Sequence, residues 1–291
     1  MKLITKFIII LQISLISCSK KGFNRQINIH SSKHNFKKEL IQTKDFVLTS
    51  YQKITDKEKP IIFYIEGDGR AFNRHGQITK NPTPKHNTLF TLATIDKKEN
   101  IVYLARPCQY TDISLNPICN NNLYWSNGRL SEKVISNINQ AIKIIRNAVN
   151  SEKQTNRFSL VGFSGGGGVA ILIAAQNPNI VKDIITIAGN LNHVKFNKYH
   201  KVSPMDKSLN PIDYSNIIKN IPQIHLSGGK DFIVPKFIAE EFTNKTNYTN
   251  KKNNKLICAK HIISKQSTHS NWSKYWEQNL EKLREEKLKC E

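Results

Sequence analysis

This 291-residue sequence has few acidic residues, no long apolar runs and no pairs of cysteines at metal-binding spacing. The 22 Asp and Glu stand against 44 Lys and Arg, which gives a formal net charge of +22 at pH 7. A mean hydropathy of −0.46 excludes a protein with many membrane-spanning helices, since each of these needs about 20 apolar residues. No Cys-x-x-Cys spacing occurs, so neither a structural zinc site nor haem attachment is predicted. Hydrophobic residues still make up 38% of the chain, which excludes a wholly disordered protein.

The excess of positive charge has two explanations in the sequence alone. It would suit a nucleic acid, an anionic membrane or an acidic ligand as partner. It also accompanies heavy use of Lys, Asn and Ile along the whole chain, which is typical of a compositional bias. The lysines do not alternate with stacking aromatic residues in any recognised module, so no nucleic-acid partner is predicted.

The first 18 residues have the pattern of an export signal. Lys2 and Lys6 precede a short apolar run over residues 7–15, too short to span a bilayer as a mature helix. Residues 15–18 read Leu-Ile-Ser-Cys, which resembles the bacterial lipobox. The resemblance implies cleavage after residue 17, acyl chains on Cys18, and anchoring of an exported lipoprotein to a bacterial membrane, with Ser19 favouring the outer membrane. An ordinary signal peptide with a chance cysteine is the alternative.

Four further cysteines remain after Cys18. They are Cys108, Cys119, Cys258 and Cys290. An even number in an oxidising compartment indicates disulfides, and four cysteines allow three pairings. We predict Cys108–Cys119 across a short loop and Cys258–Cys290 near the end of the chain, with free thiols as the alternative.

Beyond the signal, short apolar runs alternate with amphipathic stretches. Residues 18–44 are polar, basic and aperiodic and are predicted to be a tether, followed by one domain over 45–291. Strands are predicted at 46–51, 61–65, 101–105, 158–161, 184–188 and 224–227, with a weaker one near 256–264, and helices at 131–149, 169–175 and 273–289. This alternation predicts a mostly parallel sheet covered on both faces. The long polar stretch 191–220 is predicted to cap a site.

The strongest local signal is Gly162-Phe163-Ser164-Gly165-Gly166, a G-x-S-x-G pattern between a predicted strand and a predicted helix. A serine on so tight a turn is held in a strained backbone conformation, and the flanking glycines avoid side-chain clashes. The turn would raise the Ser164 hydroxyl above the sheet, and the helix N-terminus behind it would favour developing negative charge. Ser164 is therefore the predicted nucleophile, with a purely structural glycine turn as the alternative.

A serine hydroxyl needs an oriented base to take its proton. Asp231 follows the predicted strand 224–227, and His269 lies in a loop between the last predicted strand and the final helix. Asp231 could instead cap a turn. The rival bases are weaker, because His225 and His261 lie within predicted strands and His193 and His200 lie in the predicted cap.

The order Ser164, Asp231, His269, together with the elbow, resembles the α/β-hydrolase fold family over roughly residues 45–285, in a bacterial lipoprotein-like branch. The resemblance implies an eight-stranded, mostly parallel sheet with helices on both faces. It also implies acyl transfer through an acyl-serine, with Ser164 as nucleophile, His269 as general base and Asp231 as the residue that orients His269.

The oxyanion hole of such a site needs two backbone N–H groups. Gly165 is the first predicted donor, and the loop Glu66-Gly67-Asp68-Gly69-Arg70 should supply the second from Asp68 or Gly69. This loop departs from the His-Gly-rich form common in esterases. Asp68 would also place a carboxylate near the oxyanion, unless Arg70 neutralises it or it points away.

Three further side chains near the same sheet edge are weak candidates for substrate binding. Arg106 and Gln109 follow a predicted strand and could hold a polar substrate or brace the loop beneath Ser164. Trp125 could line the pocket or pack in the core.

The sequence as a whole predicts a membrane-anchored serine hydrolase that acts on a small-molecule or lipid carboxylic ester, with no metal and no organic cofactor. A serine peptidase or an acyltransferase would use the same triad. A surface lipoprotein that keeps the scaffold but only binds is the alternative from another class.

Overall fold

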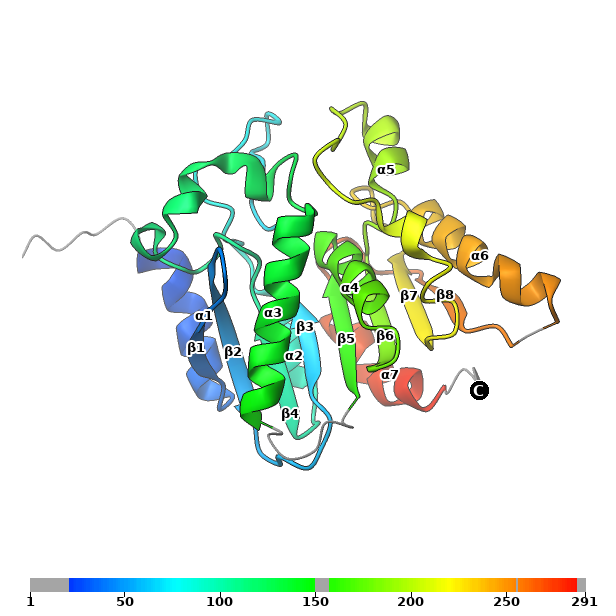
Figure 1. The fold of residues 1–291 in the computed structure, drawn as a ribbon, viewed down its shortest axis with the longest axis horizontal. Coiled ribbons are helices and arrows are strands. Elements are labelled where there is room, and N and C mark those ends of the chain that lie inside the picture. The colour runs from blue at the N-terminus through cyan, green and yellow to red at the C-terminus, as the bar shows by residue number, and fades with distance from the viewer. Residues whose placement is uncertain (1–20, 150–156, 255, 287–291) are drawn as a thin grey trace, which may run out of the picture.

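The computed structural model describes residues 21–149, 157–254 and 256–286, and its centre is an eight-stranded sheet (Figure 1). The strands are β1 (Lys37–Gln42), β2 (Val47–Ile54), β3 (Ile62–Ile65), β4 (Asn100–Leu104), β5 (Phe158–Phe163), β6 (Val181–Ile187), β7 (Gln223–Gly228) and β8 (Ala259–Ser264). Their order is β1-β2-β4-β3-β5-β6-β7-β8. β1 and β2 pair antiparallel at one edge, and all pairs from β4 to β8 are parallel. The predicted mostly parallel sheet is confirmed.

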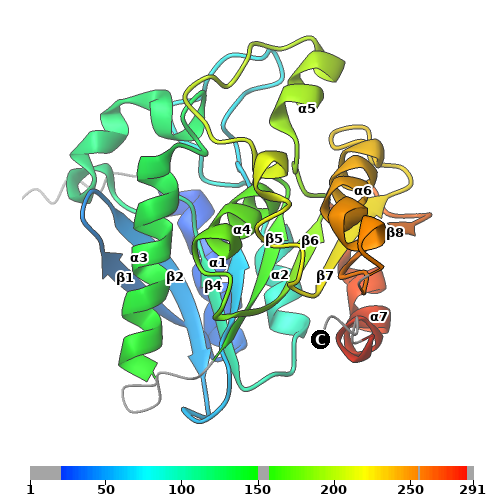
Figure 2. The ribbon, with the colours of Figure 1, turned by 45° about the vertical axis from the view of Figure 1, so that its right-hand side comes forward.

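Helices cover both faces of this sheet (Figures 1 and 2). They are α1 (Lys21–Lys33), α2 (Thr88–Ile95), α3 (Glu132–Val149), α4 (Gly165–Gln176), α5 (His193–His200), α6 (Phe237–Lys252) and α7 (Ser273–Glu285). The apolar side chains of α3, α4 and α6 form one core cluster with the sheet, and those of α1, α2 and α7 form another on the opposite face. None of the described helices is long and apolar enough to span a bilayer.

The sequence pattern explains the central elements. Every residue of β3, β4 and β5 is buried, as continuous apolar runs in a doubly covered parallel sheet require. Helix α3 buries Val134, Ile138, Ala141 and Ile145 on one face, which confirms the helical spacing read from the sequence.

The predicted tether over residues 18–44 is wrong for the part of it that the structure describes. Helix α1 buries Ile27 completely, and β1 pairs with β2 from Lys37 to Gln42 as an edge strand. Only Ile41 of β1 is buried, and its sequence, KKELIQ, has no alternation of polar and apolar residues that would mark a half-buried strand. Ordered structure therefore begins well before the predicted boundary at residue 45.

The loops that follow the parallel strands gather at the carboxyl edge of the sheet. Three short 3-10 turns, Ile113–Leu115, Pro117–Asn120 and Asn122–Trp125, lie there beyond β4. The predicted cap, 191–220, contains α5 and the 3-10 turn Pro211–Tyr214, and α5 stands above this edge in Figures 1 and 2. In an open parallel sheet this edge is where ligands bind.

A disulfide joins Cys108 to Cys119, as predicted. Cys258 is buried at the start of β8, and Cys290 lies outside the described residues, so their pairing stays a prediction. The first bridge closes a loop of the carboxyl edge across a sequence separation of 11 residues.

Replacing Cys108 and Cys119 together by serine is expected to lower the free energy of unfolding by about 2–3 kcal/mol, because the bridge removes loop-closure entropy from the unfolded chain. Urea unfolding of the double variant against wild type measures this. A single Cys108→Ser variant shows whether the remaining thiol adds a further cost, and an unchanged midpoint for the double variant would contradict a stabilising bridge.

Candidate active site

Ser164 is the single residue between β5 and α4, and its backbone has a conformation that favours glycine. Its φ is 53° and its ψ is −122°, and it occupies the N-cap of α4. Holding a non-glycine residue there costs roughly 1–3 kcal/mol. Within residues 158–174 it is also the only residue that is not buried. The strand–turn–helix predicted from the sequence therefore presents one partly exposed serine at the carboxyl edge.

The turn is possible only because Gly162 has no side chain. A Cβ at Gly162 would lie 2.4 Å from the carbonyl oxygen of Gly166, a backbone atom that cannot move aside. This close approach lets α4 begin directly above the end of β5.

Asp231 and His269 form a bonded pair. Asp231 follows β7, its side chain is fully buried, and its Oδ2 lies 2.9 Å from Nδ1 of His269. Its Oδ1 accepts hydrogen bonds from the backbone N–H groups of Ile233 and Val234 at 2.8 and 2.9 Å. Both carboxylate oxygens are thus fixed. An Nδ1–H on His269 donating to Asp231 leaves Nε2 free to accept a proton.

The imidazole lies beside the elbow. The rings of His269 and Phe163 are 5.1 Å apart between centroids, and Phe163 immediately precedes Ser164. The indole N–H of the fully buried Trp272 donates to the His269 carbonyl at 3.0 Å, which fixes the loop. The structure therefore brings Asp231 and His269 together and places the imidazole next to Phe163, the residue before Ser164.

Three of the four rival histidines are hydrogen-bonded elsewhere, and the fourth, His193, is buried at the start of α5. Nδ1 of His225 lies 2.9 Å from the Thr186 hydroxyl, and burial lowers the pKa of His225 to about 3. Nε2 of His261 lies 3.0 Å from the Ser227 hydroxyl on the next strand. His200 contacts the Ile233 carbonyl through Nε2 at 2.8 Å, at the outer side of the acid loop.

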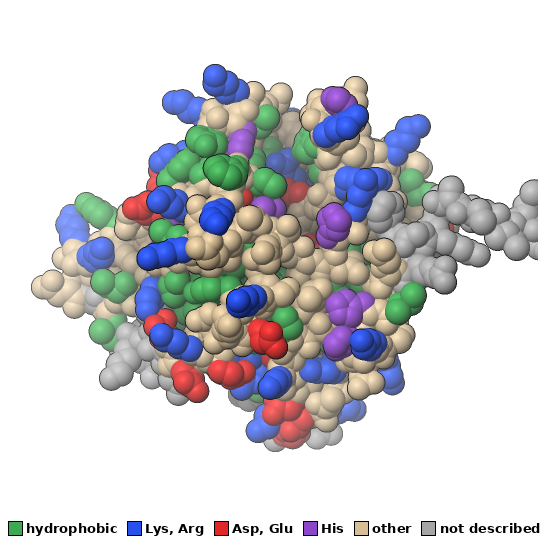
Figure 3. All heavy atoms as spheres, turned by 180° about the vertical axis from the view of Figure 1, so that it is seen from behind, with side chains coloured by type: hydrophobic (Ala, Val, Ile, Leu, Met, Phe, Trp, Pro, Cys, Tyr) green, Lys and Arg blue, Asp and Glu red, His purple; other side chains and the backbone are tan. Residues whose placement is uncertain are grey.

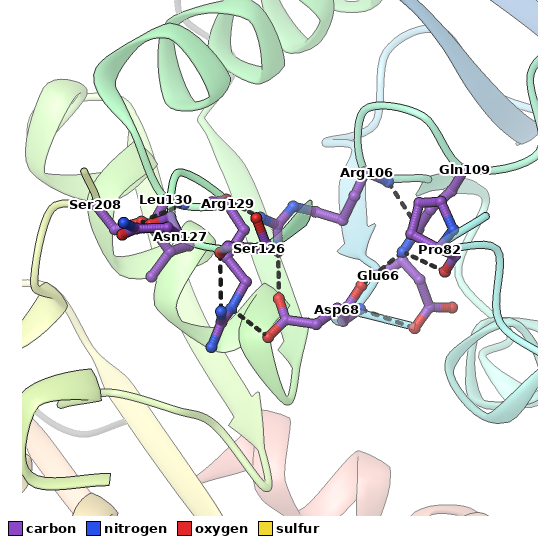
Figure 4. Close-up of polar contacts among 11 residues, drawn as sticks. Glu66, Asp68, Pro82, Arg106, Gln109, Ser126, Asn127, Arg129, Leu130 and Ser208 are labelled. Carbon is purple, nitrogen blue, oxygen red and sulfur yellow. Dashed lines mark hydrogen bonds and ion pairs between the residues drawn. The ribbon is translucent and has the colours of Figure 1, made fainter. Parts of the chain in front are cut away.

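The loop after β3 places the Asp68 carboxylate against the start of α4. Figure 4 shows this carboxylate with its two arginine partners. Asp68 Oδ2 lies 2.8 Å from Nε of Arg129, and Oδ1 lies 3.3 Å from Nη1 of Arg106. A Cβ at Gly165 would lie only 2.1 Å from Asp68 Oδ1. The carboxylate thus sits at a helix N-terminus between two guanidinium groups, which offset its charge.

The sequence offered neutralisation by Arg70 as one way to offset the charge of Asp68, and it did not single out Arg129. Arg129 lies 61 positions from Asp68 in a stretch without any motif, so only the fold brings them together. Gly67 of the same loop lies against the elbow, because a Cβ at Gly67 would lie 3.1 Å from Ser164 Cβ. Gly69 has φ 62° and packs toward the Pro82 carbonyl.

The three weak substrate candidates are buried and bonded within the protein. The Gln109 amide donates to the Gly67 carbonyl at 3.0 Å and accepts from the Arg106 backbone N–H at 3.1 Å. The indole N–H of Trp125 donates to the Thr79 carbonyl at 3.0 Å, and its ring belongs to the core. Their contacts favour the bracing alternative for Arg106 and Gln109 and the packing alternative for Trp125.

Glu66 is a site-supporting residue that the sequence did not single out. It is buried at the end of β3, accepts the Tyr103 hydroxyl at 2.6 Å and accepts the Gly67 N–H at 2.8 Å. Burial raises the pKa of its carboxyl from 4.5 to about 7, against the opposing effect of these two hydrogen bonds. The side chain shapes the loop that carries Asp68.

The raised pKa of Glu66 predicts a pH-dependent stability. An unfolded Glu loses its proton near pH 4.5 and the folded one near pH 7, so between these values the folded chain holds the extra proton. Stability from this group is therefore lost as pH rises through that window, on the order of 3 kcal/mol. Urea unfolding at pH 5 and at pH 8 measures this. From pH 5 to pH 8, the free energy of unfolding of wild type should fall by about 3 kcal/mol more than that of the Glu66→Gln variant. A difference independent of pH would contradict the raised pKa.

The chain matches a family model described as serine hydrolase (FSH1) over residues 73–270, a stretch that includes Ser164, Asp231 and His269. The chain belongs to the FSH1 serine hydrolase family. It is accordingly a hydrolase of the α/β-hydrolase type. A comparison with curated proteins found no match.

Solved structures share the fold of this serine hydrolase at low sequence identity. The Pyrococcus furiosus esterase Pf2001 is 14% identical over 87% of this chain and 92% of its own, with a TM-score of 0.60. Est1E from Butyrivibrio proteoclasticus is 12% identical over 86% and 99%, with a TM-score of 0.53. The Pyrococcus horikoshii acylaminoacyl peptidase is 15% identical over 87% of this chain, with a TM-score of 0.60, but the chain spans only 42% of that protein.

Proposed function

We propose that this serine hydrolase cleaves carboxylic esters through an acyl-enzyme on Ser164. The observation that carries the proposal is the Asp231–His269 pair, fixed by both carboxylate oxygens, beside a strained and partly exposed serine. A bonded acid and base next to a nucleophile on such a turn is the arrangement that activates a serine hydroxyl.

In the proposed reaction, Ser164 Oγ attacks the ester carbonyl carbon while His269 Nε2 takes the hydroxyl proton. The backbone N–H of Gly165, and that of Asp68 or Gly69, would stabilise the negative carbonyl oxygen. The carbon–oxygen bond to the alcohol then breaks and His269 gives the alcohol its proton. Water, activated by His269, releases the acid and restores Ser164.

We further propose that Cys18 carries acyl chains that anchor the enzyme to the membrane of a bacterium after export. The support is the apolar run and the Leu-Ile-Ser-Cys sequence, which lie outside the described residues. Mass spectrometry of the chain purified from a bacterial membrane tests this: a Cys18→Ser variant should lose the lipid mass and leave the membrane fraction. An unmodified Cys18 in the membrane-bound chain would contradict it.

Labelling with a fluorophosphonate probe, followed by a panel of p-nitrophenyl esters of increasing acyl length, tests the hydrolase proposal. Wild type should label at Ser164 and turn over at least one ester. The Ser159→Ala variant, altered on the same strand, should label like wild type, whereas Ser164→Ala should not. A folded wild type that neither labels nor hydrolyses any ester would favour a scaffold that only binds.

A further inference from the structure

Exposed apolar side chains lie on three segments that follow the candidate site along the chain or belong to the cap. The segments are 70–86, which follows Asp68, 194–202 in the cap, and 230–236, which contains Asp231. We call their exposed side chains the rim. The apolar members are Phe72, Ile78, Val194, Tyr199, Val202, Phe232 and Ile233. Phe232 follows directly on the catalytic candidate Asp231 and is 84% exposed, which is a costly position for a phenyl ring in water.

Contacts hold each rim segment in place. His200, at the end of α5, contacts the Ile233 carbonyl at 2.8 Å, and Tyr199 packs on Phe237 at the start of α6 with ring centroids 5.3 Å apart. Within the segment 70–86, Phe72 and Ile78 pair across an isolated β-bridge, and the centre of the Phe72 ring lies 5.9 Å from the guanidinium of Arg129, the partner of Asp68. The exposed apolar groups therefore project from fixed positions.

The charge of the rim has one sign. Its exposed charged residues are Arg74, Lys80, Lys85, Lys195, Lys198, Lys201, Lys230 and Lys236, of which Lys195 pairs with Glu241 of α6 at 3.2 Å. The single acidic residue of these three segments is Asp231, which is buried. In Figure 3, hydrophobic and basic side chains occur together over the upper part of the molecule, and most acidic side chains lie in the lower half. Apolar groups ringed by lysines match an anionic lipid surface, whose headgroups attract the cations while the apolar groups enter the interface.

The start of the described chain lies at the same edge of the sheet. β1 runs toward the carboxyl edge, because it pairs antiparallel with β2, which pairs antiparallel with β4. Helix α1 precedes β1 and lies beside it, so α1 begins near the carboxyl edge (Figure 1). Cys18 is three positions before Lys21. An anchor there would hold the rim, rather than the opposite edge, next to the membrane.

We propose that the rim docks on the anionic membrane surface and that the enzyme takes its ester substrate from that surface, as an amphiphile with a long acyl chain. The proposal rests on the proposed hydrolase function for its substrate, whereas the docking itself does not depend on catalysis. Phe232 and Tyr199 enter the interface, and the lysines hold the anionic headgroups.

Vesicle binding tests the docking. The reference protein is the chain from residue 18 onward with Cys18→Ser, which has no lipid anchor and keeps every described element; it is called wild type in this assay. The probe is a vesicle of equimolar phosphatidylglycerol and phosphatidylcholine, compared with phosphatidylcholine alone. Wild type should partition at least about tenfold better onto the anionic vesicles. The double variant Phe232→Ser/Tyr199→Ser should lose about tenfold, and the control Tyr248→Ser, an aromatic side chain 66% exposed on α6, should bind like wild type.

Two double lysine variants test the electrostatic part of the docking. Lys198→Gln/Lys236→Gln should weaken binding to anionic vesicles, whereas Lys57→Gln/Lys97→Gln, in loops at the amino edge, should not. Equal losses from rim and control variants would show binding through general charge and overturn the proposal. A chain that dimerises in solution, and becomes monomeric on Phe232→Ser, would assign the rim to a second copy and overturn it as well.

Activity assays separate this proposal from the proposed function. The Phe232→Ser/Tyr199→Ser variant should hydrolyse water-soluble p-nitrophenyl acetate like wild type, yet lose about tenfold on a long-chain ester carried in the anionic vesicles. Normal docking with no turnover of any ester would reject the hydrolase proposal alone. If the variant matched wild type on the soluble ester and also on the vesicle-borne ester, substrate capture at the membrane would be rejected and the hydrolase proposal would stand.

Discussion

The Ser164→Ala variant is expected to lose ester hydrolysis by roughly 10⁶-fold in kcat, because the nucleophile and its base act as a unit and neither works without the other. The fold should be retained, since the side chain of Ser164 makes no cap hydrogen bond to α4. Turnover of p-nitrophenyl esters measures the loss, and far-UV circular dichroism checks the fold. Loss within tenfold would mean that another residue carries the acyl group.

The variant Ser164→Gly separates catalysis from strain at the same position. Alanine keeps the cost of φ 53°, whereas glycine adopts this conformation freely. The glycine variant should therefore be as inactive as the alanine variant. Its free energy of unfolding in urea should exceed that of both the alanine variant and wild type by about 1 kcal/mol. A glycine variant less stable than alanine would show that the elbow stores no strain.

The Asp231→Asn variant is expected to lose about 10⁴-fold in kcat with little change in KM. Its amide oxygen should stay on the N–H groups of Ile233 and Val234, which already bind Oδ1. The amide NH₂ would then face His269 Nδ1 as a donor. This forces the imidazole proton onto Nε2, the atom that must accept the proton of Ser164.

The control for Asp231→Asn is Asp213→Asn, which alters an exposed carboxylate of the cap paired with Lys245. It should leave kcat unchanged. Both variants should unfold at similar urea concentrations, because the asparagine at position 231 keeps the turn. An Asp231→Asn variant within tenfold of wild type would mean that Asp231 does not orient the base, and the pair would then be only a structural contact.

The central elements were predictable because their signals are local. Apolar runs such as that of β4 are needed by any strand buried on both faces, and the elbow needs its glycines whatever surrounds it. The edge elements were not predictable. β1 buries one side chain, and α6 is rich in Asn and Thr, which have low helix propensity, and is held by the packing of Ile238 and Phe242.

The sequence by itself determined the strand–elbow–helix around Ser164 and the chain order of Ser164, Asp231 and His269, because these depend on neighbours along the chain. The tertiary structure alone decided what surrounds them. It set Asp68 between Arg106 and Arg129, buried Glu66 at the end of β3, and left the apolar and basic side chains of the rim exposed. Such contacts join residues far apart in the sequence. They also depend on burial, because burial changes the protonation of a group and the strength of its electrostatic contacts, and burial exists only once the chain is packed.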